Sequence, residues 1–233
     1  QRLVTSNPTP GYISRVAAVF ADNGQGERGD MGAVIKAILM DPEARTCSAL
    51  EEDRFGKLRE PFTRYTHFSK AIQMEQYYGR YWNVAYGFYQ ATNQMPLASR
   101  TVFNFFLPDF QPIGAIADNG LVGPEFQIHN SRTSIEFINR VNDWAVWGYV
   151  MDDWEAEKPS VTYNIDELTP LARDPEVLIN RLDVLFTHGM LSDRTRQIIK
   201  DAITPMISED YRNDRTRLAM YLIMISPDYA IMK

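Results

Sequence analysis

The sequence predicts an all-α protein, an irregular bundle of about eight helices joined by long ordered loops. Apolar residues recur at the 3.6-residue spacing of amphipathic helices along most of the chain. Ser, Thr, Asp or Asn directly precedes several of these stretches, often with Pro at the first helical position, and both are helix-start signals. Alternation of the kind expected for a strand is confined to residues 160–163. The 233 residues are 45% hydrophobic, which predicts a globular chain with a core.

The first two helices are predicted to form a hairpin. Thr9 followed by Pro10 starts the first helix, which ends near Asp22. A loop over residues 23–29 carries three glycines, and Asp30 then caps a second helix that ends near residues 41–42. The apolar residues that predict their inward faces are Ile13, Val16, Ala17 and Phe20 in the first helix, and Val34, Ile35, Ile38 and Leu39 in the second.

The later helices follow the same signals. Pro61 starts a helix through about Met74, and a long loop over residues 107–124 leads to the next helix, which begins at Asn130 or Ser131. The crowd of aromatic residues over 75–95 predicts no single element. The remaining helices are expected over residues 167–172, from 174–175 to Gly189, over 193–203, and from Asp210 or Asn213 to 226–227.

The start of the chain and its acidic segment are predicted from weaker signals. Leu3 and Val4 are apolar, have no cap before them and are followed by Pro8, so residues 1–6 are expected to be the end of a helix that begins upstream. The acidic segment from Asp152 to Lys158 is expected to be a connector. We therefore expect one helical domain over residues 1–233, with a subdivision near residues 150–165.

Composition excludes several classes of site. The net charge of −6 argues against a broad phosphate-binding surface, and hence against nucleic acid as a partner. No stretch approaches the roughly 20 apolar residues of a membrane helix. The single cysteine excludes an internal disulfide and a cysteine-based zinc site. The three histidines are isolated from one another in sequence, so we predict no metal site and no cofactor.

Half of the aromatic residues lie between Phe62 and Phe110. Exposed aromatic rings stack on the apolar faces of sugars, and Tyr81 and Trp82, at the centre of this group, are candidates for such a role. The alternative is that these rings fill the core. The composition of the segment favours core packing without deciding the role of each ring.

The loop that precedes residue 130 is the best candidate for a binding site. Long ordered loops often carry function, and the start of the following helix can hold an anion on its free N–H groups. The polar residues there are Gln127, His129, Asn130 and Arg132. The alternative is a packed structural loop. We expect four rings to anchor this region on the core, those of Phe103, Phe105, Phe106 and Phe110.

Several segments together resemble one bacterial family. They are residues 1–8 (QRLVTSNP), 99–109 (SRTVFNFFLPD), 120–128 (GLVGPEFQI) and 221–229 (YLIMISPDY). Over nearly its whole length the chain resembles the carboxy-terminal half of the domain-of-unknown-function 1800 family, DUF1800. The resemblance implies an exported bacterial protein of roughly twice this length, located in the periplasm or outside the cell. It also implies that the amino-terminal half of that longer protein is a partner.

Two functions remain open from the sequence. The first is a non-catalytic protein that binds a polysaccharide or an envelope protein. The alternative is part of a hydrolase or redox enzyme whose catalytic groups lie mostly in the amino-terminal half. No catalytic residue can be named, because the chain has no Gly-x-Ser-x-Gly elbow and no phosphate-binding glycine loop of the Gly-x4-Gly-Lys type.

Overall fold

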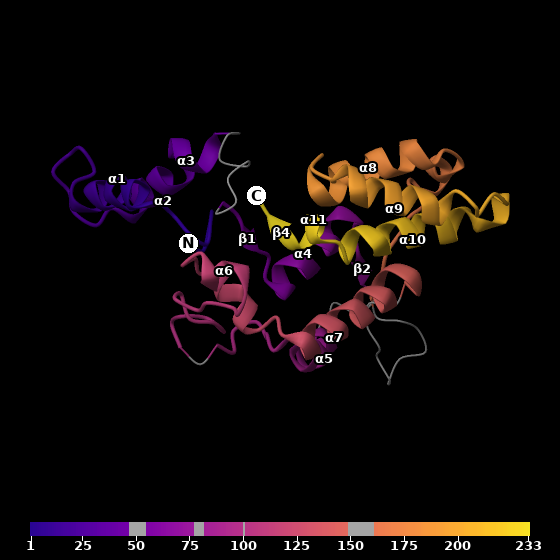
Figure 1. Ribbon diagram of the computed structural model, residues 1–233, viewed down its shortest axis with the longest axis horizontal. Helices are drawn as coiled ribbons and strands as arrows, with labels where there is room; N and C mark the ends of the chain where they lie inside the picture. The colour runs from indigo at the N-terminus through magenta and orange to yellow at the C-terminus, as the bar shows by residue number, and fades with distance from the viewer. Residues whose placement is uncertain (47–54, 77–81, 100, 149–160) are drawn as a thin grey trace. The chain divides into compact units, whose positions relative to one another are not determined.

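The predicted all-α class is confirmed by a computed structural model, which describes residues 1–46, 55–76, 82–99, 101–148 and 161–233. Helix makes up 58% of the structure, and eleven α-helices lie within the described ranges, eight of them with ten or more residues. The strands in those ranges have two residues each. Figure 1 shows the elements coloured along the chain.

The described residues form two compact units, each built from separate segments of the chain. The first unit contains residues 1–58, 106–127 and 232–233, and the second contains residues 59–105 and 128–231. The expected subdivision near residues 150–165 falls largely outside the described residues and stays a prediction. We describe each unit by itself.

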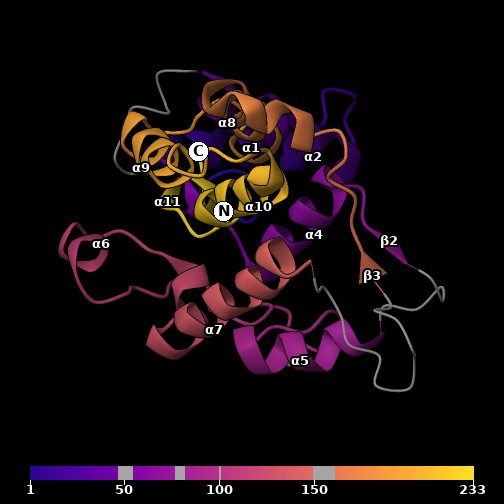
Figure 2. The same cartoon turned by 90° about the vertical axis from the view of Figure 1, so that its right-hand side faces the viewer.

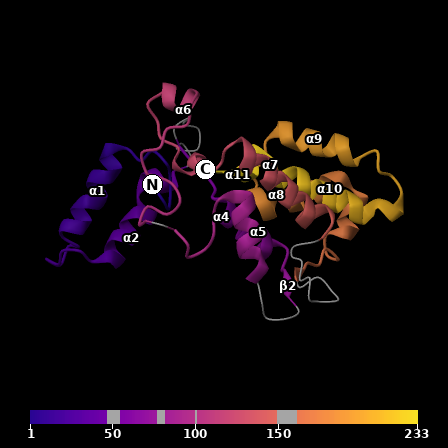
Figure 3. The ribbon, with the colours of Figure 1, turned by 90° about the horizontal axis from the view of Figure 1, so that it is seen from below.

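The first unit is dominated by a helical hairpin. Helices α1 (Pro10–Ala21) and α2 (Met31–Met40) lie side by side, as Figures 1 and 3 both show. Their predicted limits are confirmed within one or two residues. The smaller elements of this unit are α3 (Pro42–Arg45), β1 (Lys57–Leu58), α6 (Ala115–Asp118) and the 3₁₀ turn η2 (Pro124–Gln127).

Residues 1–6 are not helical, so the predicted helix end is wrong. The backbone N–H of Ser6 donates to the Gly56 carbonyl at 3.0 Å, and the Thr5 hydroxyl accepts from the Gly56 N–H at 3.1 Å. These bonds run to a distant segment instead of to the next turn. The apolar residue Leu3 is 54% exposed, whereas the polar Thr5 and Ser6 are buried, so apolar character did not show how this segment packs.

The second unit contains the longest helices. Helices α8 (Pro175–Thr187), α9 (Asp193–Ile203) and α10 (Arg212–Met224) pack together, and Figure 2 shows α5 (Trp82–Thr92) beside α7 (Ser131–Val141). Strands β2 (Glu75–Gln76) and β3 (Val161–Thr162) pair antiparallel. The other elements are α4 (Pro61–Ala71), the π-helical turn η3 (Asn142–Val146), η4 (Thr169–Arg173), η5 (Glu209–Tyr211), α11 (Pro227–Ala230) and, at the boundary with the first unit, β4 (Ile231–Met232).

The core of the second unit combines aliphatic and aromatic layers. Leu182 of α8 and Ile199 of α9 are completely buried, as are Phe186 and Ile203 of the same helices. Trp144 lies 5.1 Å from the Tyr65 ring and 6.1 Å from the Phe68 ring, centroid to centroid. Such contacts add to the burial of apolar area. The aromatic residues described in this unit thus mostly fill the core.

Tyr229, in the last helix of the second unit, packs against α4. Its side chain is completely buried, and its hydroxyl donates to the backbone carbonyl of Arg64 at 2.5 Å. Ser226 caps the short helix α11 by accepting from the Tyr229 N–H at 3.3 Å. The carboxy-terminal residues of this unit are therefore tied directly to α4.

The four Phe rings expected to be anchors behave differently from one another. Phe106 is buried, as predicted, whereas Phe103 is 47% exposed, and Phe105 and Phe110 are partly buried. The expectation is thus confirmed for Phe106 and wrong for Phe103. A run of aromatic residues does not show which ring faces inward when the backbone is irregular.

Candidate functional site

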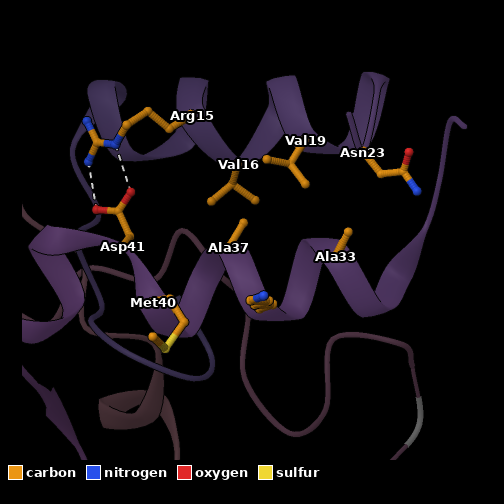
Figure 4. A pocket seen from close by; sticks show the side chains of 9 residues that line it. Arg15, Val16, Val19, Asn23, Ala33, Ala37, Met40 and Asp41 are labelled. Carbon is orange, nitrogen blue, oxygen red and sulfur yellow. Dashed lines mark hydrogen bonds and ion pairs between the residues drawn. The ribbon is translucent and has the colours of Figure 1, made fainter. Parts of the chain in front are cut away.

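A groove runs between α1 and α2 in the first unit. It encloses about 460 Å³, and Val16 and Val19 of α1 face Ala33 and Ala37 of α2 across it (Figure 4). The small alanine side chains, four residues apart on one face of α2, leave room between the helices. The remaining lining residues are Arg15, Asn23, Lys36, Met40 and Asp41.

Helix caps and one bond between the helices hold the hairpin in this form. The Thr9 hydroxyl accepts from the Tyr12 N–H at 3.1 Å, and the Asp30 carboxylate accepts from the Ala33 N–H at 3.0 Å, so both helix starts are capped. The Tyr12 hydroxyl donates to the Ile38 carbonyl and joins the two helices. In the connecting loop Gly29 has a φ of +81°, a conformation that favours glycine.

An ion pair closes one end of the groove. The Arg15 guanidinium binds the Asp41 carboxylate with two parallel hydrogen bonds, Nε to Oδ2 at 2.7 Å and Nη2 to Oδ1 at 2.8 Å (Figure 4). The hydrogen bonds from Arg15 lower the pKa of Asp41, against the opposing effect of burial. Arg15 therefore has its charge balanced within the hairpin.

Lys36 differs from Arg15 in that its charge is not balanced. The side chain lines the groove, is exposed, and forms no ion pair with any residue in the described part of the chain. Within the described residues, the groove thus combines an apolar floor with the unpaired positive charge of Lys36.

Large apolar side chains extend the groove onto the surface. Ile13 and Phe20 lie three residues before and four residues after Val16, on the same side of α1, and are 56% and 41% exposed. We call the set Ile13, Val16, Val19, Phe20, Ala33, Ala37 and Met40 the hairpin surface. The predicted inward faces of both helices are thus partly wrong, because Ile13, Phe20, Ile35 and Leu39 face solvent.

The polar residues predicted before α7 have internal partners. Asn130 caps α7 by accepting from the N–H groups of Arg132 and Thr133, both at 3.1 Å. The Arg132 guanidinium donates to the Gln90 carbonyl and to Asn93 Oδ1, each at 2.8 Å. In the first unit, the Gln127 side chain accepts from the Leu107 N–H at 2.7 Å. A binding role for these residues stays a prediction.

The other predicted residues are more buried or lie outside the described residues. Burial, with a smaller effect of the nearby Arg64 cation, lowers the pKa of His129 to about 4. Tyr81 lies outside the described residues, as does the side chain of Trp82, whose backbone begins α5. Their role in sugar stacking stays a prediction.

Sequence reasoning missed Arg15, Lys36 and Asp41. The signal was present, because two capped helices joined by a short loop run antiparallel. This pairing places the start of the first helix near the end of the second, and so brings position 15 close to position 41. What the pattern did not show is that the apolar residues around them stay exposed.

The described residues contain no group of three or more His, Cys, Asp or Glu side chains placed to hold a metal ion. Among the helices in the described ranges, none is both long and apolar enough to cross a membrane.

Comparison with known proteins extends over almost the whole chain. A family described as "Protein of unknown function (DUF1800)" matches residues 1–231. No curated protein matches the chain, and no solved structure does. The match covers both units and the hairpin surface, and it agrees with the resemblance carried by the segments from residue 1 to residue 229. The chain therefore belongs to the DUF1800 family.

Proposed function

We propose that this protein binds a protein partner through the hairpin surface, and that the bound element is an amphipathic helix. The observation that carries the proposal is the exposure of large apolar side chains around a preformed groove. Contiguous exposed apolar surface commonly marks an interaction site, and a groove between two helices suits a third.

The dimensions of the hairpin suit such an occupant. With 12 residues, α1 is about 18 Å long, so a partner helix contacts it over about three turns. Complete burial of an apolar side chain contributes roughly 1.5–3 kcal/mol, so covering half-exposed Ile13 and Phe20 contributes about 1 kcal/mol each. Met40, also exposed, adapts its shape to different occupants.

The charge of the groove determines which amphipathic helices bind well. Arg15 is already paired with Asp41, so the unbalanced charge of the groove is that of Lys36. We expect the partner helix to carry a carboxylate on the edge of its apolar face, opposite Lys36. Charge complementarity of this kind favours the correct partner and its orientation.

The cellular location is a separate proposal. The family resemblance implies an exported protein, and we propose that this chain acts in the periplasm or outside the cell. The test is fractionation of the native host with an antibody against the chain. Recovery only in the cytoplasmic fraction would contradict the proposal.

Binding is tested with two synthetic helical peptides of about 15 residues, with leucine on one face. One peptide carries Glu beside the apolar face and the other carries Lys in its place. Fluorescence anisotropy should show weak binding of the Glu peptide and at least fivefold weaker binding of the Lys peptide. The Lys36→Glu variant should reverse this preference.

Matched valine variants locate the binding site. Val19→Glu places a charge in the groove and should abolish binding of the Glu peptide. Val184→Glu makes the same change at an exposed position of α8 and should leave binding unchanged. Equal binding by wild type and Val19→Glu would refute the proposal. Displacement of the peptide by soluble polysaccharides would instead favour a glycan as the ligand.

A further inference from the structure

Arg64 of α4 is a buried cation that pairs with no anion among the residues that the structure describes. The residue is 3% exposed, and the Nε and Nη2 atoms of its guanidinium have no hydrogen-bond partner among the described residues. No carboxylate in the described part of the chain forms an ion pair with it. Glu60, one turn earlier, uses its carboxylate to accept from Gln94 and Asn104. A buried charge is normally paired, so its isolation needs an explanation.

The surroundings of Arg64 are aromatic and basic. The guanidinium carbon lies 3.9 Å from the centroid of the Phe137 ring, a cation–π contact. Burial lowers the pKa of Arg64 to about 10, with Tyr229 opposing and Arg59 adding to the shift, so the side chain stays charged at neutral pH. His129 is also near, but burial and the Arg64 charge lower its pKa to about 4, so it is uncharged at neutral pH. The cationic neighbour of Arg64 is therefore Arg59, and an anion at this place would be attracted by both guanidinium groups.

The two free atoms of Arg64 are the pair that binds a carboxylate. Nε and Nη2 form one edge of the planar guanidinium, and their N–H bonds are parallel. The same edge of Arg15 holds the Asp41 carboxylate with bonds of 2.7 and 2.8 Å. In the first unit, therefore, the same edge of an arginine binds a carboxylate.

We propose that the Nε–Nη2 edge of Arg64, resting on the Phe137 ring, is a binding site for the carboxylate of a small ligand. The proposal is independent of the hairpin surface and goes beyond it. Because the residue is 97% shielded, a ligand reaches the edge only after neighbouring side chains move, so association should be slower than diffusion allows. A bulky folded partner does not fit these surroundings.

The direct test is an NMR titration of the full chain labelled with ¹⁵N-arginine. Sodium acetate replaces sodium chloride at constant ionic strength, and the Nε–H signal of Arg64 is assigned from the Arg64→Lys variant. We expect a saturable shift of this signal and a rise in Tm that follows the logarithm of acetate concentration. An unchanged signal would overturn the proposal.

Variants separate the bidentate edge from charge alone. Arg64→Met should remove the acetate response, and Arg64→Lys, which keeps the charge without the planar edge, should weaken it at least tenfold. Arg194→Met removes a charge from the exposed surface of α9 and should keep the full response. Loss of the response in Arg194→Met would overturn the proposal. If Arg64→Met fails to fold, the wild-type titration still decides.

Two further probes identify the kind of anion and its source. Inorganic phosphate acting where acetate does not would overturn the assignment of a carboxylate. N-acetyl-glutamic acid α-amide models an acidic protein side chain. A response to acetate alone supports a free carboxylic acid, and a response to the amide at lower concentration supports a carboxylate carried by a peptide.

Discussion

The α1–α2 hairpin and the α8–α9–α10 bundle start from the same local signals and end with different surfaces. Helices α1, α2, α8 and α9 are all capped by side chains and carry apolar residues at helical spacing. In α8, Leu178, Ile179, Leu182 and Phe186 are completely buried, whereas α1 and α2 each bury one apolar side chain, Tyr12 and Val34. Helical periodicity thus predicts a helix in both regions, but it does not show whether the chain itself covers the apolar face.

The largest expected effect is in the bundle. Leu182→Ala leaves a cavity among side chains that are themselves fully buried, and we expect it to lower the free energy of unfolding by about 3–4 kcal/mol. Urea denaturation followed by circular dichroism measures this change. A loss below about 1 kcal/mol would show that the bundle is as loosely packed as the hairpin.

The second prediction concerns the pH dependence of stability in the second unit, which contains His67 and His129. Burial lowers the pKa of both His67 and His129 to about 4, so on acidification the unfolded chain takes up protons first, near pH 6.5. The contribution of these two histidines to the free energy of unfolding is present in full above pH 6.5 and is lost as the pH falls toward 4. Because both side chains are only partly buried, solvent screening reduces the effect, and we expect about 1–2 kcal/mol from each.

The double variant His67→Gln/His129→Gln tests this origin. Its free energy of unfolding should change little between pH 6.5 and 4.5, whereas that of the wild type falls. Urea denaturation at several pH values gives both profiles. An unchanged decline in the double variant would show that other groups cause the acid sensitivity.

The third prediction concerns acid in the hairpin. Arg15 lowers the pKa of Asp41 below its unfolded value, so the pair stabilises the fold above about pH 4, and this contribution is lost as the pH falls further. Asp41→Asn keeps a helix-capping side chain and loses the ion pair. It should cost about 1 kcal/mol at pH 7 and nothing near pH 2. Asp109→Asn, an exposed change in the same unit, is the control and should cost almost nothing at either pH.

The smallest expected effect is Ile35→Ala on α2. The side chain is 46% exposed, so its truncation removes little buried area and should cost less than about 0.5 kcal/mol, apart from the change in helix propensity. Thermal unfolding of the isolated protein measures this. A loss comparable to that of Leu182→Ala would mean that Ile35 is covered in solution, for example by a second copy of the chain.

Much of the fold could be predicted because its signals are local. Thr9, Asp30 and Asn130 cap the helices that they were predicted to start. The aromatic segment before residue 95 could not be assigned, because Gly, Tyr and Trp in close succession fit a helix, a turn or a packed loop equally well. The helix predicted over residues 167–172 is a 3₁₀ turn over 169–173, a difference of hydrogen-bond register that composition does not specify.

The candidate sites were harder to predict than the fold. Arg132 and Gln127 are residue types that often occur in binding sites. In the structure, however, their side chains form hydrogen bonds with backbone groups. Arg64 gave no signal, because its isolation depends on Phe137 and on the absence of an acid beside it after packing. An unpartnered group is a property of the folded surroundings and leaves no trace in sequence spacing.

The bond from Tyr229 to the carbonyl of Arg64 has a consequence for how the protein is made. It joins residues 165 positions apart, and Tyr229 comes almost last along the second unit. On the ribosome, α4 therefore emerges long before the side chain that fills the space against it. The second unit can complete its core only when synthesis has passed Tyr229, and its earlier helices stay incompletely packed during translation, when a chaperone can bind them.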